Sequence, residues 1–194
     1  MRILMAGASG VLGRATLPHL ITHEVVGLSR SREELESLRK LGAEPVLCDV
    51  YDYDALLRVA TCVGPSIVVN FLTDLSTGSA AANNQIRREG GTNLLAAATA
   101  TAAHRLVVES VAFTLDEDAA DAVEQLEQAT REFAGESLIL RFGRFWGPET
   151  AHRTTPQPPA IHIERAGAHA AQHLLHAPSG TYVVTDRDGS ARVG

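Results

Sequence analysis

The first 14 residues constrain the fold more than any other stretch of the chain. A short apolar run at 2–6 leads directly into Gly7, Gly10 and Gly13, spaced G-x-x-G-x-x-G, and an amphipathic segment follows. This order predicts a strand, a tight turn and a helix. Gly7 allows the sharp turn, Gly10 lets a pyrophosphate approach the backbone, and Gly13 lets the helix pack against the strand. An ordinary glycine-rich turn is the alternative, but the position at the start of a βαβ unit favours nucleotide binding at the helix N-terminus.

The remaining chain alternates short apolar runs with longer amphipathic segments, which is typical of parallel sheets with crossover helices. We therefore expect an α/β fold in one domain, with a doubly wound, mostly parallel sheet of about seven strands. Strands are expected near 2–6, 24–28, 44–48, 66–72, 105–110, 137–140 and 180–185. Helices are expected near 11–22, 32–41, 53–62, 80–102, 116–134 and 164–176, followed by a frayed tail at 186–194.

Finer features of the first three helices also follow from the pattern. Ile21 completes the apolar face of the first helix. Ser31 and Glu34 have the spacing of a capping box at the start of the second helix, and Asp52 is placed to cap the third.

Composition narrows the range of partners. The 194 residues carry a net charge of −6 without a basic block, so nucleic acid is not expected as a main partner. No apolar run reaches the roughly 18 residues of a membrane span, and no signal peptide fits because the first strand starts at Arg2. Cys48 and Cys62 form no C-x-x-C motif or disulfide pattern, so both are expected to pack as small apolar groups. We therefore expect a reducing, cytoplasmic location.

The end of the second strand bears on cofactor choice. Arg30 lies there, 20 positions after Gly10. An acidic residue at this place would hydrogen-bond a ribose 2′-hydroxyl. Ser29 and Arg30 stand there instead, with Arg32 nearby, and a guanidinium can pair bidentately with phosphate. The sequence therefore favours NADP(H) over NAD(H); the alternative is that both arginines are simply solvated.

Three other strand ends carry candidate ligand contacts. Asp49 follows the third strand, where the loop passes the adenine ring in this topology, although it would serve equally well as a cap or turn residue. The fourth strand ends at 70–73 and the fifth at Ser110, at the sheet edge where open α/β folds bind ligands. A serine there can donate a hydrogen bond to a substrate carbonyl or simply cap the strand.

Taken together, several segments resemble the extended and atypical branch of the short-chain dehydrogenase/reductase family, the NAD(P)-dependent epimerase/dehydratase type. The matching segments are the glycine motif, 41–49, 68–73, 90–95, Ser110, 140–148 (Leu-Arg-Phe-Gly-Arg-Phe-Trp-Gly-Pro) and 162–166. The resemblance implies a Rossmann-like fold with NADP across the first three strands and with Ser110 and Phe142–Phe145 bordering the nicotinamide and substrate. The expected cofactor contacts are Gly7, Ser9, Gly10, Val11, Leu12, Gly13, Ser29, Arg30, Arg32, Asp49, Val50, Phe71, Leu72, Thr73, Phe142 and Gly143.

The sequence departs from this family in two respects. The catalytic Tyr-x-x-x-Lys pair would fall near Val123 and Glu127, and the only lysine in the sequence is Lys40. Ordinary carbonyl reduction or sugar epimerisation by the family mechanism is therefore not expected. Only 46 residues follow Pro148, so we expect 1–148 to form the dinucleotide-binding core and 149–194 the remnant of a reduced substrate lobe. Any substrate pocket should then be shallow or completed by a second subunit.

Glu109, Ser110 and Asp74 are the candidate catalytic residues. A partly desolvated Glu109 would have a raised pKa and suit general acid or base chemistry, but strand alternation keeps it on the opposite face from Ser110. The alternative for Glu109 and Asp74 is a solvated surface acid. Glu127 is expected to pair with Arg131 at i, i+4 on the helix surface.

The histidines of the last helix have a spacing that can bind zinc. His169, His173 and His176 share one face, but no carboxylate or cysteine ligand pattern accompanies them. We expect a solvated or subunit-facing histidine row and no metal.

The sequence thus favours an NADP(H)-dependent enzyme acting on a small organic substrate, with water or Ser110 delivering the proton. A non-catalytic NADP-sensing regulator of the NmrA-like kind is one alternative. A non-redox lyase or cyclase using Glu109 or Asp74 is another. The family resemblance also implies a homodimer paired through the helices at 80–102 and 117–134.

Overall fold

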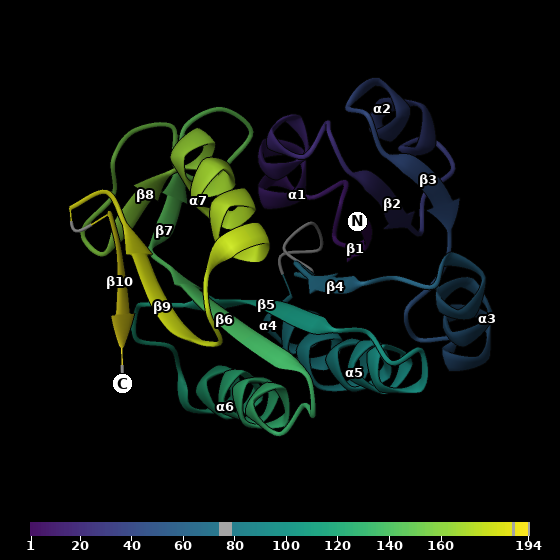
Figure 1. Cartoon of the computed structure of the whole chain (residues 1–194). Helices are drawn as coiled ribbons and strands as arrows, with labels where there is room; N and C mark the ends of the chain where they lie inside the picture. The colour runs from purple at the N-terminus through teal and green to yellow at the C-terminus, as the bar shows by residue number, and fades with distance from the viewer. Residues whose placement is uncertain (74–78, 188, 194) are drawn as a thin grey trace.

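A central sheet of eight strands runs through the molecule in the order β10-β9-β6-β5-β4-β1-β2-β3 (Figure 1). The computed structural model describes residues 1–73, 79–187 and 189–193. Neighbouring strands are parallel except for β9 and β10, which are antiparallel. The strands of this sheet are β1 (Arg2–Ala6), β2 (Glu24–Ser29), β3 (Glu44–Leu47), β4 (Ile67–Asn70), β5 (Arg105–Val111), β6 (Glu136–Phe142), β9 (Gly180–Thr185) and β10 (Gly189–Val193). A separate parallel pair is formed by β7 (Arg144–Trp146) and β8 (Ala160–His162).

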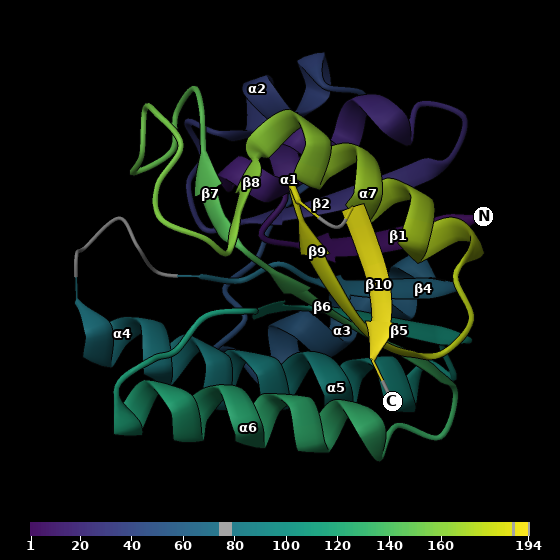
Figure 2. The ribbon, with the colours of Figure 1, turned by 90° about the vertical axis from the view of Figure 1, so that its left-hand side faces the viewer.

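Helices cover both faces of the sheet (Figures 1 and 2). They are α1 (Val11–Thr16) with the 3-10 turn η1 (Leu17–His19), α2 (Leu35–Lys40), α3 (Tyr53–Val63), α4 (Ala80–Gln85), the π-helical turn η2 (Ile86–Gly90), α5 (Gly91–Ala100), α6 (Glu117–Arg131) and α7 (Ile163–His176). One face is packed by α1, α2 and α7, and the other by α3, α5 and α6.

Strand β1 explains the two-layer packing. Its residues Ile3 and Met5 join the core under α1 and α7, while Leu4 and Ala6 join the core under α3 and α5, and all four are fully buried. Successive side chains of a strand point to opposite faces, so a strand covered on both sides needs a continuous apolar run. The run at 2–6 meets this need.

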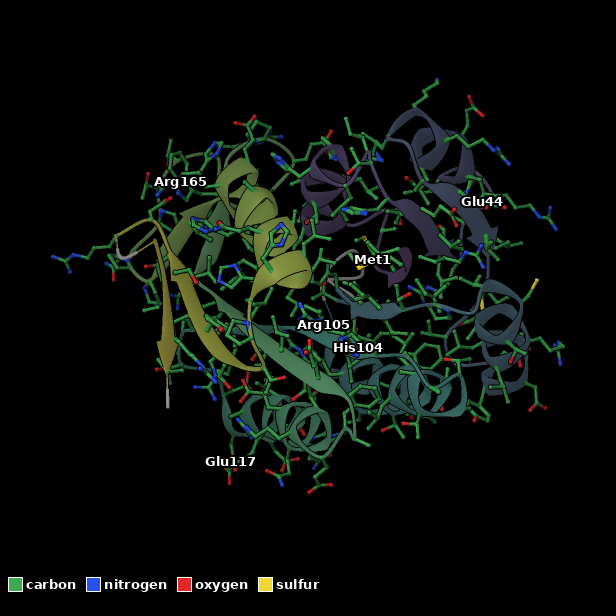
Figure 3. All side chains as sticks on the ribbon, in the orientation of Figure 1. Met1, Glu44, His104, Arg105, Glu117 and Arg165 are labelled. Carbon is green, nitrogen blue, oxygen red and sulfur yellow. The ribbon has the colours of Figure 1, made fainter. Side chains whose placement is uncertain are left out.

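The amino-terminal edge of the sheet is closed by a buried arginine. Arg105, the first residue of β5, pairs with Glu136 and donates a 2.9 Å hydrogen bond to the carbonyl of Leu174 at the end of α7. Figure 3 shows Arg105 beside His104 and well away from Glu117, which begins α6 after the carboxyl end of β5. Open α/β sheets bind ligands at the opposite, carboxyl-terminal edge.

The expected α/β fold is confirmed, and each expected strand is present within a few residues. The expectation of a frayed tail is wrong: Gly189–Val193 forms β10, which pairs antiparallel with β9 and gives the sheet eight strands. The tail lacks an apolar run because β10 is an edge strand whose residues are only partly buried or exposed.

The helices differ from expectation in local details. The first helix ends early, with α1 stopping at Thr16 and η1 at His19, and Ile21 is 74% exposed instead of packed. The capping box is not formed, because the Ser31 hydroxyl accepts from the amide of Glu33 and α2 begins only at Leu35. The Asp52 cap of α3 is confirmed by a 2.9 Å bond from the Ala55 amide.

Two further differences concern 80–102 and the cysteines. The long helix is interrupted by the π-helical turn η2 between α4 and α5. Cys48 is buried as expected, whereas Cys62 is exposed and does not pack as an apolar group.

Candidate cofactor and substrate site

The three glycines of the turn between β1 and α1 are required for different reasons. Gly7 has a φ of +81°, and a Cβ there would lie 2.1 Å from the carbonyl oxygen of Phe71. A Cβ on Gly13 would lie 2.3 Å from the carbonyl oxygen of Gly7. Gly10 is different, since it is exposed and, among the described residues, its Cβ would meet only the Gly7 oxygen, at 3.2 Å. Packing alone explains the first two glycines, whereas Gly10 keeps open the side from which a phosphate would approach.

The start of α1 offers backbone donors to that space. Gly10 is the N-cap, and no side chain among the described residues caps the helix. The Gly10 amide donates to the Gly7 carbonyl at 3.0 Å, which closes the turn and leaves the amides of the first helical turn for a ligand. Ser9 and Val11 are partly accessible, whereas Leu12 is buried. The residues present therefore fit a bound pyrophosphate.

The loop after β2 presents two exposed arginines, Arg30 and Arg32. The buried Ser29 hydroxyl accepts from the Ser31 amide at 3.1 Å and donates to the Ser31 carbonyl at 3.2 Å. The serine thus shapes the loop that carries the arginines. Nearby, Arg14 of α1 is held by Ser37 and Glu34 of the α2 region.

The loop after β3 supports a turn role for Asp49. The exposed carboxylate accepts from the amide of Tyr51 at 3.0 Å, as in an Asx turn. Val50 is buried, and its carbonyl accepts from Asn93 of α5 at 2.8 Å. The adenine contact expected of Asp49 stays a prediction, for which one bond leaves acceptor capacity on its carboxylate.

The ends of β4 and β6 carry the last five of the expected cofactor contacts. Phe71 and Phe142 are buried, so their backbone is what they can offer to a ligand, whereas Leu72 and Thr73 are partly accessible. A Cβ on Gly143 would lie 2.7 Å from the Ala160 amide nitrogen, so this glycine is needed for packing against β8. Asp74 lies outside the described residues.

Ser110 closes a buried polar network at the end of β5. Its hydroxyl donates a 2.6 Å hydrogen bond to Glu127 of α6. Glu127 also accepts from Arg141 of β6, at 2.8 and 2.5 Å, and from Arg131 at 2.6 Å. Burial acts to raise the pKa of Glu127, but the hydrogen bonds from Arg141 and Ser110 and the neighbouring positive charges hold it below its usual value. Glu127 is thus a buried carboxylate at the site.

This network corrects one expectation. The pairing of Glu127 with Arg131 is confirmed, but its place on the helix surface is wrong, because the Glu127 side chain is 4% exposed and faces β5 and β6. The i, i+4 spacing is the same for a surface pair and for a buried one, so it does not distinguish them. Arg141 comes from β6, not from the helix that carries Glu127 and Arg131. Its positive charge is what allows the carboxylate to be buried.

Glu109 lies on the other face of β5, as alternation requires. Its neighbour Val107 packs under α7 and Val108 packs under α5, which places Glu109 and Ser110 on opposite faces. Burial raises the pKa of Glu109 to about 7, and the positive charge of buried Arg87 opposes this shift. A carboxyl that titrates near neutral pH is suited to proton transfer in either direction.

Arg144 and Phe113 form a contact that the sequence did not suggest. Phe113 follows β5 and Arg144 begins β7, directly after β6. The guanidinium carbon lies over the Phe113 ring, 4.3 Å from its centroid. The two residues are far apart in sequence, so no spacing pattern could indicate the contact.

Strand β7 is anchored at its end by Asp186. This carboxylate accepts from Trp146 Nε1 at 2.6 Å and from Arg165 of α7 at 2.9 Å. The 144–148 stretch is thereby tied to β9 and α7. The sequence does not indicate this role of Asp186, because the pattern predicts a tail from residue 186 onward.

The histidine row of α7 is not uniformly solvated, contrary to expectation. His173 is buried, its Nδ1 contacts the His169 carbonyl oxygen at 2.7 Å, and its Nε2 lies 2.7 Å from the Ser190 hydroxyl. Both ring nitrogens of His173 are thus engaged within the protein. Among the described residues, no group of three or more histidine, cysteine or acidic side chains is placed to hold a metal ion. In the same part of the chain, no helix is long and apolar enough to cross a bilayer.

With this geometry in place, comparison with known proteins identifies the family. Residues 3–132 match the NAD dependent epimerase/dehydratase family, and the chain belongs to it. It is 33% identical over 189 residues to the 3-diazoavenalumate denitrifying reductase of Streptomyces sp., covering 78% of this chain and 59% of that protein. It is 42% identical over 67 residues to an uncharacterized protein of Schizosaccharomyces pombe, covering 33% of this chain and 23% of that protein.

Solved structures support the fold. The Bordetella bronchiseptica enzyme WbmG in complex with NAD is 18% identical, with a TM-score of 0.77, and the match covers 99% of this chain and 74% of that one. The Thermus thermophilus UDP-glucose 4-epimerase in complex with NAD is 17% identical, with a TM-score of 0.77, and the match covers 99% and 79%. The chain spans 59% of the reductase's length, so the overlap with that relative is partial.

Proposed function

We propose that this protein is an NADP(H)-binding oxidoreductase that reduces a small electrophilic organic substrate without a tyrosine proton donor. The hydrogen bond from Ser110 to Glu127 carries this proposal. The Ser110 hydrogen is directed to a buried carboxylate, so the oxygen can accept a hydrogen bond but does not have its proton free to give. A substrate that gains a hydride and needs no proton from this position suits such a site.

The cofactor part rests on the glycine turn and the loop after β2. The exposed side of Gly10 and the first amides of α1 would hold the pyrophosphate. Arg30 and Arg32 would bind the 2′-phosphate that distinguishes NADP from NAD. When bound, the reduced nicotinamide would supply a hydride. The family is described as NAD dependent, which agrees with a nicotinamide cofactor.

The Streptomyces relative suggests the kind of substrate. Its name describes a reduction in which a diazo compound loses nitrogen. When a carbon bearing a diazonium group gains a hydride, the new C–H bond takes both hydride electrons. The C–N bond breaks, and its electron pair leaves with N₂. Charge and atoms balance without a proton, so a Tyr/Lys pair is unnecessary for this chemistry. We propose an aromatic diazonium, or a similarly electrophilic small molecule, as the substrate class.

Glu109 supports a second candidate. A carboxyl with a pKa near 7 is half protonated at neutral pH, so it could serve as the acid in a reduction that does need a proton. It could also abstract a proton in a non-redox lyase or cyclase reaction. The non-redox reaction would be favoured if the wild type turns over substrate without oxidising the cofactor and Glu109→Gln loses that turnover.

We also propose that residues 1–148 form the cofactor-binding core, with 149–194 as a reduced substrate lobe, and that two copies pair through α5 and α6 in the cytoplasm. The family resemblance supports the pairing. Light scattering on the purified protein would test it, with a single-chain mass as the contrary result.

The cofactor proposal is tested by titrating NADPH and NADH into the wild type and Arg30→Asp, followed by nicotinamide fluorescence. We expect the wild type to bind NADPH about tenfold or more tightly than NADH. Arg30→Asp should reverse or remove this preference, because it replaces a phosphate-binding cation with an acid. Equal binding of the two cofactors by both proteins would contradict the proposal.

A further inference from the structure

Arg144 and Phe113 lie at the carboxyl edge of the sheet, beside the strand ends that carry Glu109 and Ser110. The guanidinium carbon of Arg144 lies over the Phe113 ring, 4.3 Å from its centroid, and both side chains are partly accessible. Stacking uses the flat face of the guanidinium and leaves its N–H edge free to bind. In such a pair, the ring holds the cation in one orientation before a ligand binds.

The backbone holds both partners in place. The Ala112 amide donates to the Phe142 carbonyl at 2.8 Å, which ties the segment before Phe113 to the end of β6. The Arg144 amide donates to the Pro159 carbonyl at 2.9 Å. These bonds hold the backbone on which the two side chains stand next to the neighbouring ends of β5 and β6.

The charge of Arg144 is uncompensated in the described part of the chain. Its side chain has no ion pair or hydrogen bond there, and its contact is with the Phe113 ring. By contrast, Arg14, Arg105 and Arg165 each pair with a carboxylate. A partly desolvated arginine without a counter-ion, at the edge where ligands bind, is complementary to an anion on the ligand.

We propose that Arg144, positioned by Phe113, binds the carboxylate of an aromatic or conjugated acid and so sets the substrate class of the proposed reductase. A planar guanidinium fork matches the planar carboxylate, and the apolar ring beneath it favours a flat, apolar substrate body. One cation matches one negative charge.

This inference rests on the proposed function, so it needs a binding test that does not depend on turnover. Calorimetry on the NADPH-loaded protein would compare benzoate with its neutral analogue benzamide. We expect benzoate to bind the wild type about 10- to 100-fold more tightly. Arg144→Met should remove that preference, and Arg144→Lys, which keeps the charge but loses the fork, should restore part of it. Arg58→Met, at an exposed position of α3 across the sheet, is the matched control.

A turnover test separates the two proposals. The wild type and Arg144→Met would be compared on 4-carboxybenzenediazonium and on unsubstituted benzenediazonium. We expect a higher KM in the variant for the carboxylated compound alone, with kcat and the NADPH Kd nearly unchanged.

The outcomes are distinguishable. If neither compound is reduced but benzoate binds through Arg144, the reductase proposal fails and the carboxylate site stands. If both compounds are reduced equally well and benzoate shows no preference, the carboxylate site is overturned and the reductase proposal stands. A weaker NADPH affinity in Arg144→Met, with no change in benzoate binding, would assign Arg144 to the cofactor and also overturn the inference.

Discussion

The hydroxyl of Ser110 donates a 2.6 Å hydrogen bond to Glu127, a carboxylate that Arg141 and Arg131 also contact. The contact joins the end of β5 to the middle of α6 and places a negative charge inside the protein. Glu127→Gln should lower the free energy of unfolding by about 1–3 kcal/mol, because it leaves two arginines without their counter-ion. The partial exposure of both arginines keeps the loss below that of a fully buried pair. Urea unfolding measures it, and Glu132→Gln, at an exposed position on the same helix segment, should change stability by less than about 0.5 kcal/mol.

Glu127 should also make stability depend on acid pH. Its folded pKa lies below the ordinary value of 4.5, so its contribution is fully present above pH 4.5 and is lost as pH falls through the folded value. The difference between wild type and Glu127→Gln should therefore shrink below pH 4.5. A difference that stays constant down to pH 2 would show that the charge of Glu127 is not what stabilises the network.

Glu109 should have the opposite pH dependence. Its folded pKa of about 7 is above the ordinary 4.5, so the folded state binds the proton more tightly than the unfolded state. The contribution of Glu109 to the free energy of unfolding of the wild type should fall as pH rises from 4.5 to 7 and then level off. Glu109→Gln should be about 1–3 kcal/mol more stable than the wild type at pH 8 and equal to it below pH 4.5. Thermal unfolding across this pH range would check the sign.

Substitutions of the glycines in the β1–α1 turn should affect protein stability and NADPH binding separately. Gly10→Ala should fold with nearly wild-type stability, since its Cβ has one close neighbour in the described part of the chain, at 3.2 Å, but should bind NADPH at least tenfold more weakly. Gly13→Ala should be strongly destabilised, because its Cβ would lie 2.3 Å from the Gly7 oxygen. Melting curves with and without NADPH measure both effects. Equal NADPH affinity of Gly10→Ala and wild type would argue against a phosphate at this turn.

The last strand should depend on a bond from α7. The Ser190 hydroxyl lies 2.7 Å from Nε2 of buried His173, so Ser190→Ala should lower stability by about 0.5–1.5 kcal/mol. Amide exchange should rise mainly in β10, the edge strand. Uniform exchange across the whole sheet would show instead that β10 unfolds only with the rest of the protein.

The sequence was sufficient for the features that a local pattern determines. The apolar run at 2–6, the glycine turn and the Asp52 cap each depend on neighbouring residues, and the structure agrees with all three. Strand β10 could not be recognised, because an edge strand exposes much of its surface and carries no apolar run.

The site itself depends on contacts that no local pattern records. Glu127 looks like one half of a surface i, i+4 pair until Arg141 of β6 is brought beside it. Arg144 and Phe113 meet only because β5 and β6 are neighbours in the sheet. The burial of Glu127 is therefore decided by charges from separate elements, which the sequence does not place side by side.

The most direct test of the central claim follows one hydrogen atom. The protein would be given 4-carboxybenzenediazonium with NADPH deuterated at the transferable position of the nicotinamide, beside a protein-free control, and the benzoate product analysed by mass spectrometry. We predict one deuterium in the product, and none when unlabelled NADPH is used in D₂O. Benzoate without deuterium from the labelled cofactor, or equal formation of benzoate in the protein-free control, would contradict hydride transfer at this site.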